Sequence, residues 1–160
     1  MKYTFCHKTA IVTGASSGIG KALALSLGEK GAKVMLAARR ENVLQDVVAR
    51  ITAKGGTAAY CVTDVSRPED CRKLVEETVR LWGGIDILIC NAGIAHQGLV
   101  THIGEEKWHE LFEVNVHGTY RTICAVLPGM IRRQAGCIIT VASMWGQVGA
   151  SCEGCYSATK

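Results

Sequence analysis

Short runs of apolar residues alternate along the chain with longer segments in which apolar residues recur at helical spacing. The short runs have the length of strands and no polar face, and they comprise residues 9–12, 33–38, 57–62, 85–90 and 137–142. The longer segments comprise residues 19–30, 41–54, 68–82, 105–112, 114–133 and a last helix that begins near Gly154. Proline suits the first turn of a helix at Pro68, whereas Pro128 favours an interruption within segment 114–133.

Strands that are apolar on both faces and separated by helices indicate a parallel sheet that is covered on both sides. This arrangement is the doubly wound, Rossmann-type α/β fold, and we expect the strand order 3-2-1-4-5. The 160 residues suit one domain with its own core. Ligands of such sheets bind at the carboxyl ends of the strands, near the switch between the first and fourth strands. The polar motifs of the chain fall at these ends, which predicts a ligand site there.

The composition narrows the class of protein. Hydrophobic residues make up 48% and charged residues 20%, which is typical of a globular domain. No run approaches the roughly 18 apolar residues needed to span a bilayer, and segment 1–10 has no apolar stretch of a secretory leader. The net charge of +4 is spread out, and the basic pairs at 39–40 and 132–133 are too short for a nucleic-acid arm. We therefore expect a cytoplasmic protein without membrane or nucleic-acid partners.

The eight cysteines raise the question of a metal or redox site. Cys61, Cys90 and Cys137 fall inside apolar runs, where a free thiol packs as a small hydrophobic side chain. Cys152 and Cys155 form a single Cys-x-x-Cys pair, and a zinc site would need a second pair or histidines at ligand spacing nearby. We predict no metal site, and a redox or metal role of this pair stays open as an alternative.

A glycine-rich segment with the spacing Gly-x3-Gly-x-Gly follows the first strand. Glycine allows a tight turn, lets the backbone approach a pyrophosphate, and lets the next helix pack on the strand. That helix directs N–H groups and the positive end of its dipole at the anion. A bare turn would have the same glycines, but the strand before and the helix after favour a phosphate loop. The predicted cofactor contacts in this loop are Gly14, Ser16, Ser17, Gly18, Ile19 and Gly20.

The end of the second strand distinguishes between the two nicotinamide cofactors. A site for NAD has an acidic residue about 20 positions beyond the loop, where it bonds the ribose 2′-hydroxyl. The chain has Arg39 and Arg40 at this place and no acid. An arginine accommodates the 2′-phosphate of NADP, because the planar guanidinium matches a phosphate with two hydrogen bonds. We predict NADP(H), with Arg39 as the main contact and Arg40 as support, although two solvated arginines at a helix start would have the same sequence.

Tyr156 and Lys160 are spaced to share one face of a helix. A free tyrosine ionises only near pH ~10 and is a poor acid at neutrality, but a neighbouring ammonium favours the phenolate. The pair can therefore act as a general acid toward an alkoxide that forms from a carbonyl. Ser143 follows the fifth strand, where its hydroxyl can bond a substrate oxygen. Asn115 lies in an apolar helix, where an asparagine is unfavourable unless it joins a polar network.

Taken in order, these motifs resemble the short-chain dehydrogenase/reductase family over nearly the whole chain. The matching positions are Thr13-Gly14-x-x-x-Gly18-x-Gly20, Asp64-Val65, Asn91-Ala92-Gly93, Asn115, Ser143 and Tyr156-x-x-x-Lys160. Each motif alone is a weak signal, but the joint pattern is specific. The resemblance implies an oxidoreductase in which the cofactor carries the chemistry and the protein supplies position and electrostatics.

The resemblance also implies the role of each catalytic residue. Tyr156 is then the acid–base catalyst, and Lys160 promotes its ionisation and holds the nicotinamide ribose, so that both also contact the cofactor. Ser143 orients the carbonyl of the substrate. Asn115 anchors a water molecule that relays protons to Lys160.

On the adenosine side, the resemblance implies contacts at the ends of the third and fourth strands. Asp64, followed by Val65, contacts the adenine. Asn91 lies along the adenosine ribose, and the glycine in the run Asn91, Ala92 and Gly93 lets the cofactor pass close to the backbone. These five residues complete the predicted binding site for NADP(H).

The segment from Ser143 to Lys160 borders the substrate site and carries a finer resemblance. It is similar to bacterial 3-oxoacyl-acyl-carrier-protein reductases, and most to the branch that reduces the 5-aminopentanone group on modified elongation factor P. The implied substrate is a small-molecule or carrier-bound carbonyl. The resemblance further implies a homodimer or homotetramer, formed through segment 114–133 and the helix near Tyr156.

Members of the family continue beyond the position of Lys160 through two further strands and a substrate-capping segment. The resemblance therefore implies that residues 1–160 form a single, C-terminally incomplete NADP(H)-binding domain that lacks these parts. A catalytically idle nucleotide-binding fragment is for this reason the main alternative to an active reductase.

Overall fold

One parallel sheet forms the centre of the computed structural model, which describes residues 5–160. Its strands are β1 (Thr9–Thr13), β2 (Lys33–Ala38), β3 (Thr57–Val62), β4 (Ile87–Cys90) and β5 (Cys137–Thr140). All neighbouring strands pair in parallel, in the order β3-β2-β1-β4-β5. The predicted fold class and strand order are thus confirmed. The prediction that segment 1–10 holds no leader falls in part on residues 1–4, which lie outside the described residues.

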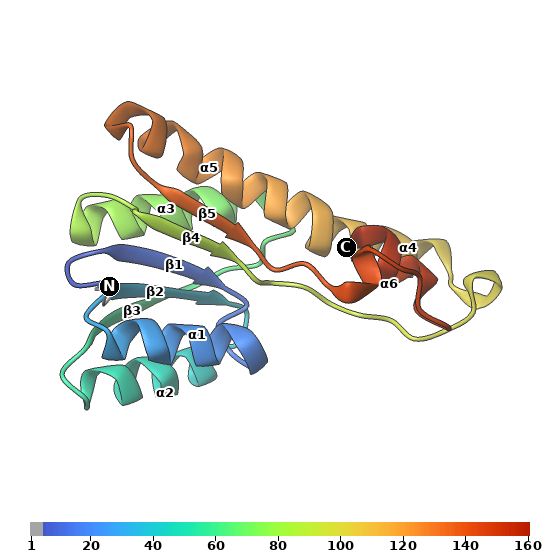
Figure 1. Ribbon diagram of the computed structural model, residues 1–160, viewed down its shortest axis with the longest axis horizontal. Coiled ribbons are helices and arrows are strands. Elements are labelled where there is room, and N and C mark those ends of the chain that lie inside the picture. The colour runs from blue at the N-terminus through green and yellow to red at the C-terminus, as the bar shows by residue number, and fades with distance from the viewer. Residues whose placement is uncertain (1–4) are drawn as a thin grey trace.

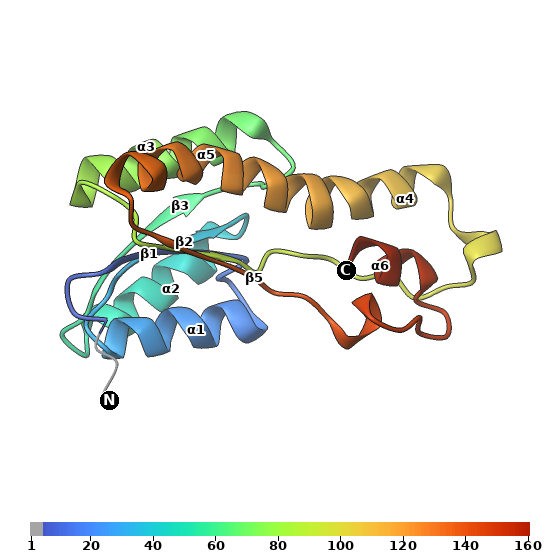
Figure 2. The same ribbon diagram turned by 45° about the horizontal axis from the view of Figure 1, so that its top comes forward.

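Helices cover both faces of the sheet (Figures 1 and 2). One face carries α1 (Gly18–Glu29) and α2 (Glu41–Thr52), and the other carries α3 (Pro68–Trp82) and α5 (Gly118–Arg133). Each face has its own hydrophobic core, because successive side chains of a strand point to opposite sides. Val12 of β1 belongs to the core under α1 and α2, while Ile11 belongs to the core under α3 and α5.

The strands are shorter at some ends than the apolar runs suggest. The predicted run 85–90 pairs as a strand only over Ile87–Cys90, although Ile85 is buried with 3% of its surface exposed. The run 137–142 likewise pairs only over Cys137–Thr140. The apolar pattern reports burial rather than hydrogen bonding, and a buried residue next to a strand therefore extends the predicted range. The observed ends of three further elements differ by one or two residues from the predicted ranges, which were 19–30 and 41–54 for helices and 9–12 for a strand. Differences of this size are usual at the ends of elements.

The predicted interruption near Pro128 is wrong. Helix α5 runs through Pro128 to Arg133, and the irregular turn lies earlier, where a π-helical segment, η2 (Glu113–His117), joins α4 (Glu105–Phe112) to α5. A proline removes one helical hydrogen bond, to the carbonyl four residues before it. That residue is Cys124, which is exposed, so water can replace the lost donor.

Several short elements lie beyond the carboxyl ends of the strands. These are η1 (Val100–His102), η3 (Met144–Gly146) and α6 (Gly154–Thr159), and α6 packs against α4 and η3 (Figures 1 and 2). The loops that follow β4 and β5 lead into this region. Within residues 5–160, no helix combines the length and the apolar character needed to cross a membrane.

Candidate cofactor and catalytic site

The glycine loop connects β1 to α1, and two of its glycines, Gly14 and Gly18, are needed for different reasons. Gly14 has φ +66°, and a Cβ there would lie 2.8 Å from Asn91 Nδ2 and 2.9 Å from Ala92 Cα. Gly18 has φ +51° with no atom close to its Cβ position, so it is needed for its left-handed backbone rather than for space. The loop is therefore held against the end of β4 and turns directly into the first turn of α1.

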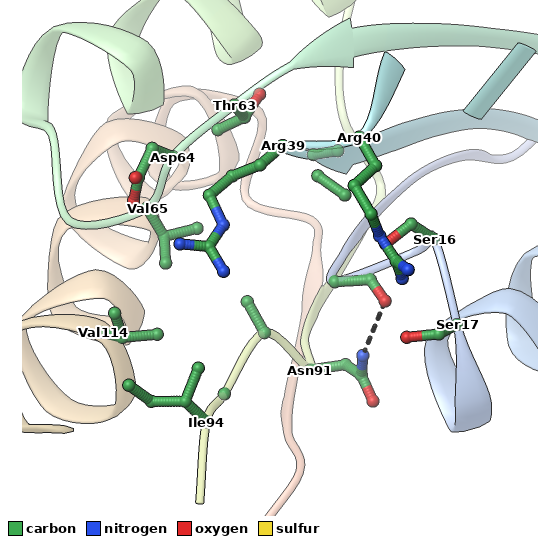
Figure 3. A pocket seen from close by; sticks show the side chains of 15 residues that line it. Ser16, Ser17, Arg39, Arg40, Thr63, Asp64, Val65, Asn91, Ile94 and Val114 are labelled. Atoms are coloured by element: carbon green, nitrogen blue, oxygen red, sulfur yellow. Dashed lines mark hydrogen bonds between the residues drawn. The ribbon is translucent and has the colours of Figure 1, made fainter. Parts of the chain in front are cut away.

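A set of hydrogen bonds joins the ends of β1 and β4 at the switch point of the sheet. Asn91 Nδ2 donates to Thr13 O at 3.0 Å and to Gly14 O at 3.3 Å. Thr13 Oγ1 accepts from the N–H groups of Asn91 and Ala92, both at 3.0 Å, and donates to Ile89 O. The amide of Asn91 thus fixes the glycine loop, as Figure 3 shows for its bond to Gly14. Its predicted place along the adenosine ribose stays a prediction.

A pocket of about 270 Å³ opens at these strand ends (Figure 3). The predicted residues that line it are Gly14, Ser16, Ser17, Arg39, Arg40, Asp64, Val65, Asn91, Ala92 and Gly93. The lining also includes Ala37, Ala38, Thr63, Ile94 and Val114, which we had not predicted. Position alone could have identified Thr63, because it follows β3 as Asn91 follows β4. The predicted contacts that are not among the lining residues are Gly18, Ile19, Gly20, Tyr156 and Lys160.

Two guanidinium groups enter the pocket from the end of β2. Arg39 extends toward Asp64 and Val65, and Arg40 lies over the glycine loop (Figure 3). Arg40 Nη2 donates to Ser16 Oγ at 2.9 Å, so Arg40 also links β2 to the loop. No acidic residue ends β2, and this side of the pocket is therefore positively charged.

Asp64 is the one acidic residue in the lining of the pocket. Its Oδ1 accepts hydrogen bonds from Ser66 N at 3.0 Å and from Ser66 Oγ at 2.7 Å. Burial by itself raises the pKa of Asp64, but the bonds from Ser66 and the charges of Arg39 and Arg67 together hold the pKa below its usual value. The carboxylate is therefore charged at neutral pH and fixed in one orientation.

Gly93, Asn115 and Lys160 meet at the nicotinamide end of the predicted site. A Cβ on Gly93 would lie 3.3 Å from Asn115 Oδ1 and 3.4 Å from Lys160 Nζ. Lys160 Nζ donates to Val141 O at 2.9 Å and lies 5.9 Å from the ring centroid of Tyr156. Burial lowers the pKa of the Lys160 ammonium from its usual value. Three residues far apart in the sequence thus come together at this place, and their catalytic roles stay predictions.

Asn115 is buried in the π-helical turn, and both polar atoms of its side chain are hydrogen bonded. Oδ1 accepts from Ile94 N at 2.8 Å, and Nδ2 donates to Ile94 O at 2.9 Å and to Thr159 Oγ1 at 2.8 Å. Thr159 Oγ1 donates in turn to Tyr156 O at 2.7 Å. Asn115 therefore clamps the loop after β4 to the helix that carries Tyr156. Sequence reasoning predicted a polar network at Asn115 but missed Thr159. This residue is one of the three unspecified positions in the motif Tyr156-x-x-x-Lys160.

Ser143 lies where β5 has ended and η3 begins. Its Oγ accepts a hydrogen bond from Trp145 N at 3.2 Å, so it caps the short helix. No hydrogen bond joins Ser143 to Tyr156 among the residues that the structure describes. Its role toward a substrate carbonyl stays a prediction.

The cysteine pair near Tyr156 is divided between surface and interior. Cys152 is an exposed free thiol with φ +58°, and Cys155 is a buried free thiol with 4% of its surface exposed. In residues 5–160, no group of three or more His, Cys, Asp or Glu side chains is arranged to hold a metal ion.

Comparison with known proteins identifies the family to which this geometry corresponds. The profile described as short chain dehydrogenase matches residues 8–160. An uncharacterized oxidoreductase of Listeria monocytogenes is 42% identical over 157 residues, which cover 98% of this chain and 63% of the relative. A 3-oxoacyl-[acyl-carrier-protein] reductase of Staphylococcus epidermidis is 34% identical over 155 residues, which cover 96% of this chain and 64% of the relative.

Solved structures agree with the sequence relatives. A short-chain type dehydrogenase/reductase from Mycobacterium marinum superposes with a TM-score of 0.94 at 36% identity, covering 98% of this chain and 65% of that protein. An NAD⁺-bound xylitol dehydrogenase superposes with a TM-score of 0.95 at 32% identity, covering 99% of this chain and 61% of that protein. The chain thus spans less than two thirds of the length of these relatives.

Proposed function

Because the chain belongs to the short-chain dehydrogenase family, we propose that it carries the NADPH site and the acid–base group of an enzyme that reduces a carbonyl to an alcohol. The observation that carries this proposal is the meeting of Gly93, Asn115 and Lys160 beside Tyr156, at the same sheet edge as the glycine loop. Two distant ends of one cofactor would thereby be held by a single rigid edge of the sheet.

The residues present fit a dinucleotide phosphate. Gly14 and Gly93 keep backbone free of side chains at both ends of the site, as an extended ligand lying against the strand ends requires. The guanidinium groups of Arg39 and Arg40 favour a 2′-phosphate over a 2′-hydroxyl. The relative solved with NAD⁺ shows that the family also includes NAD-binding members, so the choice of NADPH rests on these two arginines.

Each catalytic side chain has a defined task in this proposal. NADPH, when bound, supplies the hydride to the carbonyl carbon. Tyr156 Oη donates the proton that the carbonyl oxygen gains, and the Lys160 ammonium favours the phenolate that Tyr156 leaves behind. Ser143 Oγ orients the carbonyl oxygen from the end of β5. The clamp from Asn115 to Thr159 keeps Tyr156 and Lys160 in place. The family resemblance implies that a water held at Asn115 then returns the proton through Lys160.

The region around Tyr156 favours a substrate with an apolar part. Exposed apolar side chains lie on the loops after β4 and β5, namely Leu99, Val100, Met144 and Val148. These loops touch one another, since Gly98 N donates to Cys152 O at 2.7 Å. Exposed apolar side chains on these two loops suit an acyl chain, in line with the name of the Staphylococcus epidermidis relative.

A carbonyl substrate with an amino group is the second candidate. Glu153 precedes Tyr156 by three residues, and its Oε1 accepts from Gln97 Nε2 at 3.1 Å. A carboxylate three residues before the acid in the sequence is a candidate partner for the ammonium of a 5-aminopentanone group. The resemblance of segment 143–160 to reductases of modified elongation factor P favours the same substrate.

Helix α5 supports an oligomer of the whole enzyme. Its exposed face carries a line of apolar side chains at helical spacing, comprising Val116 at the end of η2 and Tyr120, Leu127 and Ile131 of α5. Such a line marks an interaction surface. It lies on the segment through which the family resemblance implies a dimer or tetramer.

The test of the proposal combines binding and turnover. We expect saturable NADPH binding by fluorescence titration, followed by NADPH oxidation when a 3-oxoacyl thioester or a 5-aminopentanone is added. Tyr156→Phe should leave binding unchanged and slow turnover by roughly a hundredfold or more, because general acid catalysis contributes on that order. Turnover that survives Tyr156→Phe would contradict the assignment of the acid. Binding without any turnover would instead favour the idle nucleotide-binding fragment.

A further inference from the structure

The turn that follows β3 is tied to helix α5 by a charged side chain outside the pocket. Arg121 Nη1 donates to Ser66 O at 2.8 Å and to Glu113 Oε2 at 2.6 Å. The Arg121 side chain is 24% exposed, so the guanidinium is largely enclosed between the turn and the helix. None of these three residues lines the pocket itself.

A short chain of hydrogen bonds leads from Arg121 to the pocket wall. Ser66, whose carbonyl Arg121 holds, donates its own N–H and hydroxyl to Asp64 Oδ1. Asp64 and Val65 belong to the turn after β3, and both line the pocket (Figure 3). A displacement of Ser66 at its carbonyl would therefore also move its N–H and its hydroxyl, the two donors that orient the Asp64 carboxylate.

The π-helical turn supplies the partner that orients Arg121. Glu113 Oε2 accepts from Arg121, and Glu113 Oε1 is hydrogen bonded to His117 Nδ1 at 2.6 Å. These two bonds, that of Arg121 first, hold the pKa of Glu113 below its usual value and keep it ionised. A charge-assisted bond fixes a guanidinium more firmly than a neutral one. The irregular turn thus contributes to the adenosine side of the site as well as to Asn115.

The other contacts on the same turn involve no charged side chain of α5. Gly118 allows close approach, since a Cβ there would lie 2.6 Å from Val65 Cγ2. Cys71 Sγ donates weakly to Val65 O at 3.6 Å, and Asp64 N donates to Asp70 Oδ2 at 2.9 Å. Arg121 is therefore the one hydrogen-bonded tie between α5 and the turn within the described residues.

We propose that Arg121 is a positioning residue for the adenosine end of the cofactor site, acting through Ser66 on Asp64. The inference rests on the proposed function, because it takes NADPH as the ligand and Asp64 as its adenine contact. If Arg121 and Glu113 formed only an ion pair outside the pocket, with no influence on Asp64, replacing either residue would leave ligand binding unchanged. A positioning role predicts an effect that is confined to the adenosine half of the ligand.

The experiment compares NADPH with 2′,5′-ADP, which is only the adenosine half. We expect Arg121→Gln to lower the affinity for both ligands by the same factor, about five- to twentyfold. This is the range for losing a hydrogen bond from a charged donor that does not itself contact the ligand. The increase in nicotinamide fluorescence at saturating NADPH should stay as in the wild type. Arg121→Lys, which keeps one charged donor for Ser66 O, should recover part of the affinity.

Matched variants separate this role from general damage. Arg80 forms an equally short ion pair with Glu77 on α3, away from the pocket, so Arg80→Gln should bind both ligands as the wild type does. Glu113→Gln leaves the donor to Ser66 in place and removes only the charge that orients it. Glu113→Gln should therefore lower the affinity for both ligands by a smaller factor than Arg121→Gln does. If Arg121→Gln does not fold, the affinities of Glu113→Gln test the positioning role.

The outcomes distinguish this inference from the function on which it rests. Wild-type affinity for 2′,5′-ADP in both Arg121→Gln and Glu113→Gln would overturn the positioning role while leaving NADPH binding intact. A lower affinity for NADPH with an unchanged affinity for 2′,5′-ADP would also overturn the positioning role. A wild-type chain that folds but binds neither ligand would overturn the proposed function, and this inference with it.

Discussion

Several side chains at the carboxyl edge of the sheet bind one another as well as facing the pocket. The amide of Asn91 is bonded to two carbonyls of the glycine loop, and Arg40 is bonded to Ser16. A substitution at either residue would therefore disturb the loop and the ligand together. Arg39 has no such bond among the described residues, and it extends into the pocket (Figure 3). It is the residue at which cofactor choice can be tested without disturbing the loop.

Arg39→Ala should weaken NADPH binding by roughly ten- to a hundredfold, the range expected for lost charge-assisted hydrogen bonds to a phosphate. NADH lacks that phosphate, so its affinity should hardly change. Parallel fluorescence titrations with the two cofactors measure the difference. Arg50→Ala, on the last turn of α2 and outside the pocket, is the control and should bind both as before. An equal loss of NADPH and NADH would sink the assignment of Arg39 to the 2′-phosphate.

At the scale of elements, the π-helical turn and α6 depend on one another. Helix α6 has six residues, too few for a helix to be stable without tertiary contacts. Its contacts include the bond from Asn115 to Thr159 and the bond from Lys160 to Val141 O. The π-helical turn in turn places Asn115 so that it reaches both α6 and the loop after β4. Extra residues in one turn of a helix often mark a functional position, and here they orient a buried amide.

Thr159→Val should destabilise the chain by about 1–3 kcal/mol, because the buried Nδ2 of Asn115 then loses a hydrogen-bond partner. Thr159→Ser keeps the hydroxyl and should be much closer to the wild type. Urea unfolding followed by circular dichroism measures both free energies of unfolding. If the valine variant is as stable as the serine variant, the clamp from Asn115 to Thr159 has no energetic role.

At the scale of the whole molecule, the sheet separates two hydrophobic cores. Cys90 lies in the core under α3 and α5, and Cys71 of α3 is buried with 1% of its surface exposed. Burial, with a smaller contribution from Cys71, raises the pKa of the Cys90 thiol from 9.0 to about 11. Burial also raises the pKa of Cys71. Both thiols are thus neutral and inaccessible in the folded state.

Thiol labelling with iodoacetamide at pH 8 should therefore modify Cys124, Cys137 and Cys152, which are exposed, and spare Cys71 and Cys90 until the chain unfolds. Mass spectrometry after increasing times, with and without denaturant, locates the modified residues. Fast modification of Cys90 in the native chain would mean that the core opens locally.

The raised pKa of Cys90 also gives a direction to the pH dependence of stability. Below about pH 9, folded and unfolded thiols are both protonated, and the stability contribution of the buried thiol is fully present. Between pH 9.0 and about 11, the unfolded thiol ionises while the folded one does not, so the free energy of unfolding falls. Cys90→Ser should show a smaller fall over this range in urea unfolding. An unchanged pH slope would exclude this contribution.

The local pattern of the sequence was enough to predict the architecture. Apolar runs such as 33–38 and 57–62 and the helical segment 68–82 agree with the observed elements, because periodicity directly reflects which faces are buried. The strand order could be predicted as well, since parallel strands joined by helices allow few arrangements. The glycine spacing also predicted a tight loop, and the φ angles of Gly14 and Gly18 give its physical reason.

Only the tertiary structure decided which polar groups meet. Thr13 and Asn91 are 78 residues apart, Ser66 and Arg121 are 55 apart, and Asn115 and Thr159 are 44 apart, yet each pair is hydrogen bonded. No periodicity encodes such contacts, because they depend on the register of strands and the position of an irregular turn. The same holds for Pro128, which helix α5 accommodates without an interruption. The sequence determined the layers and the loop by itself, whereas the packing of these layers determined the network that holds the site.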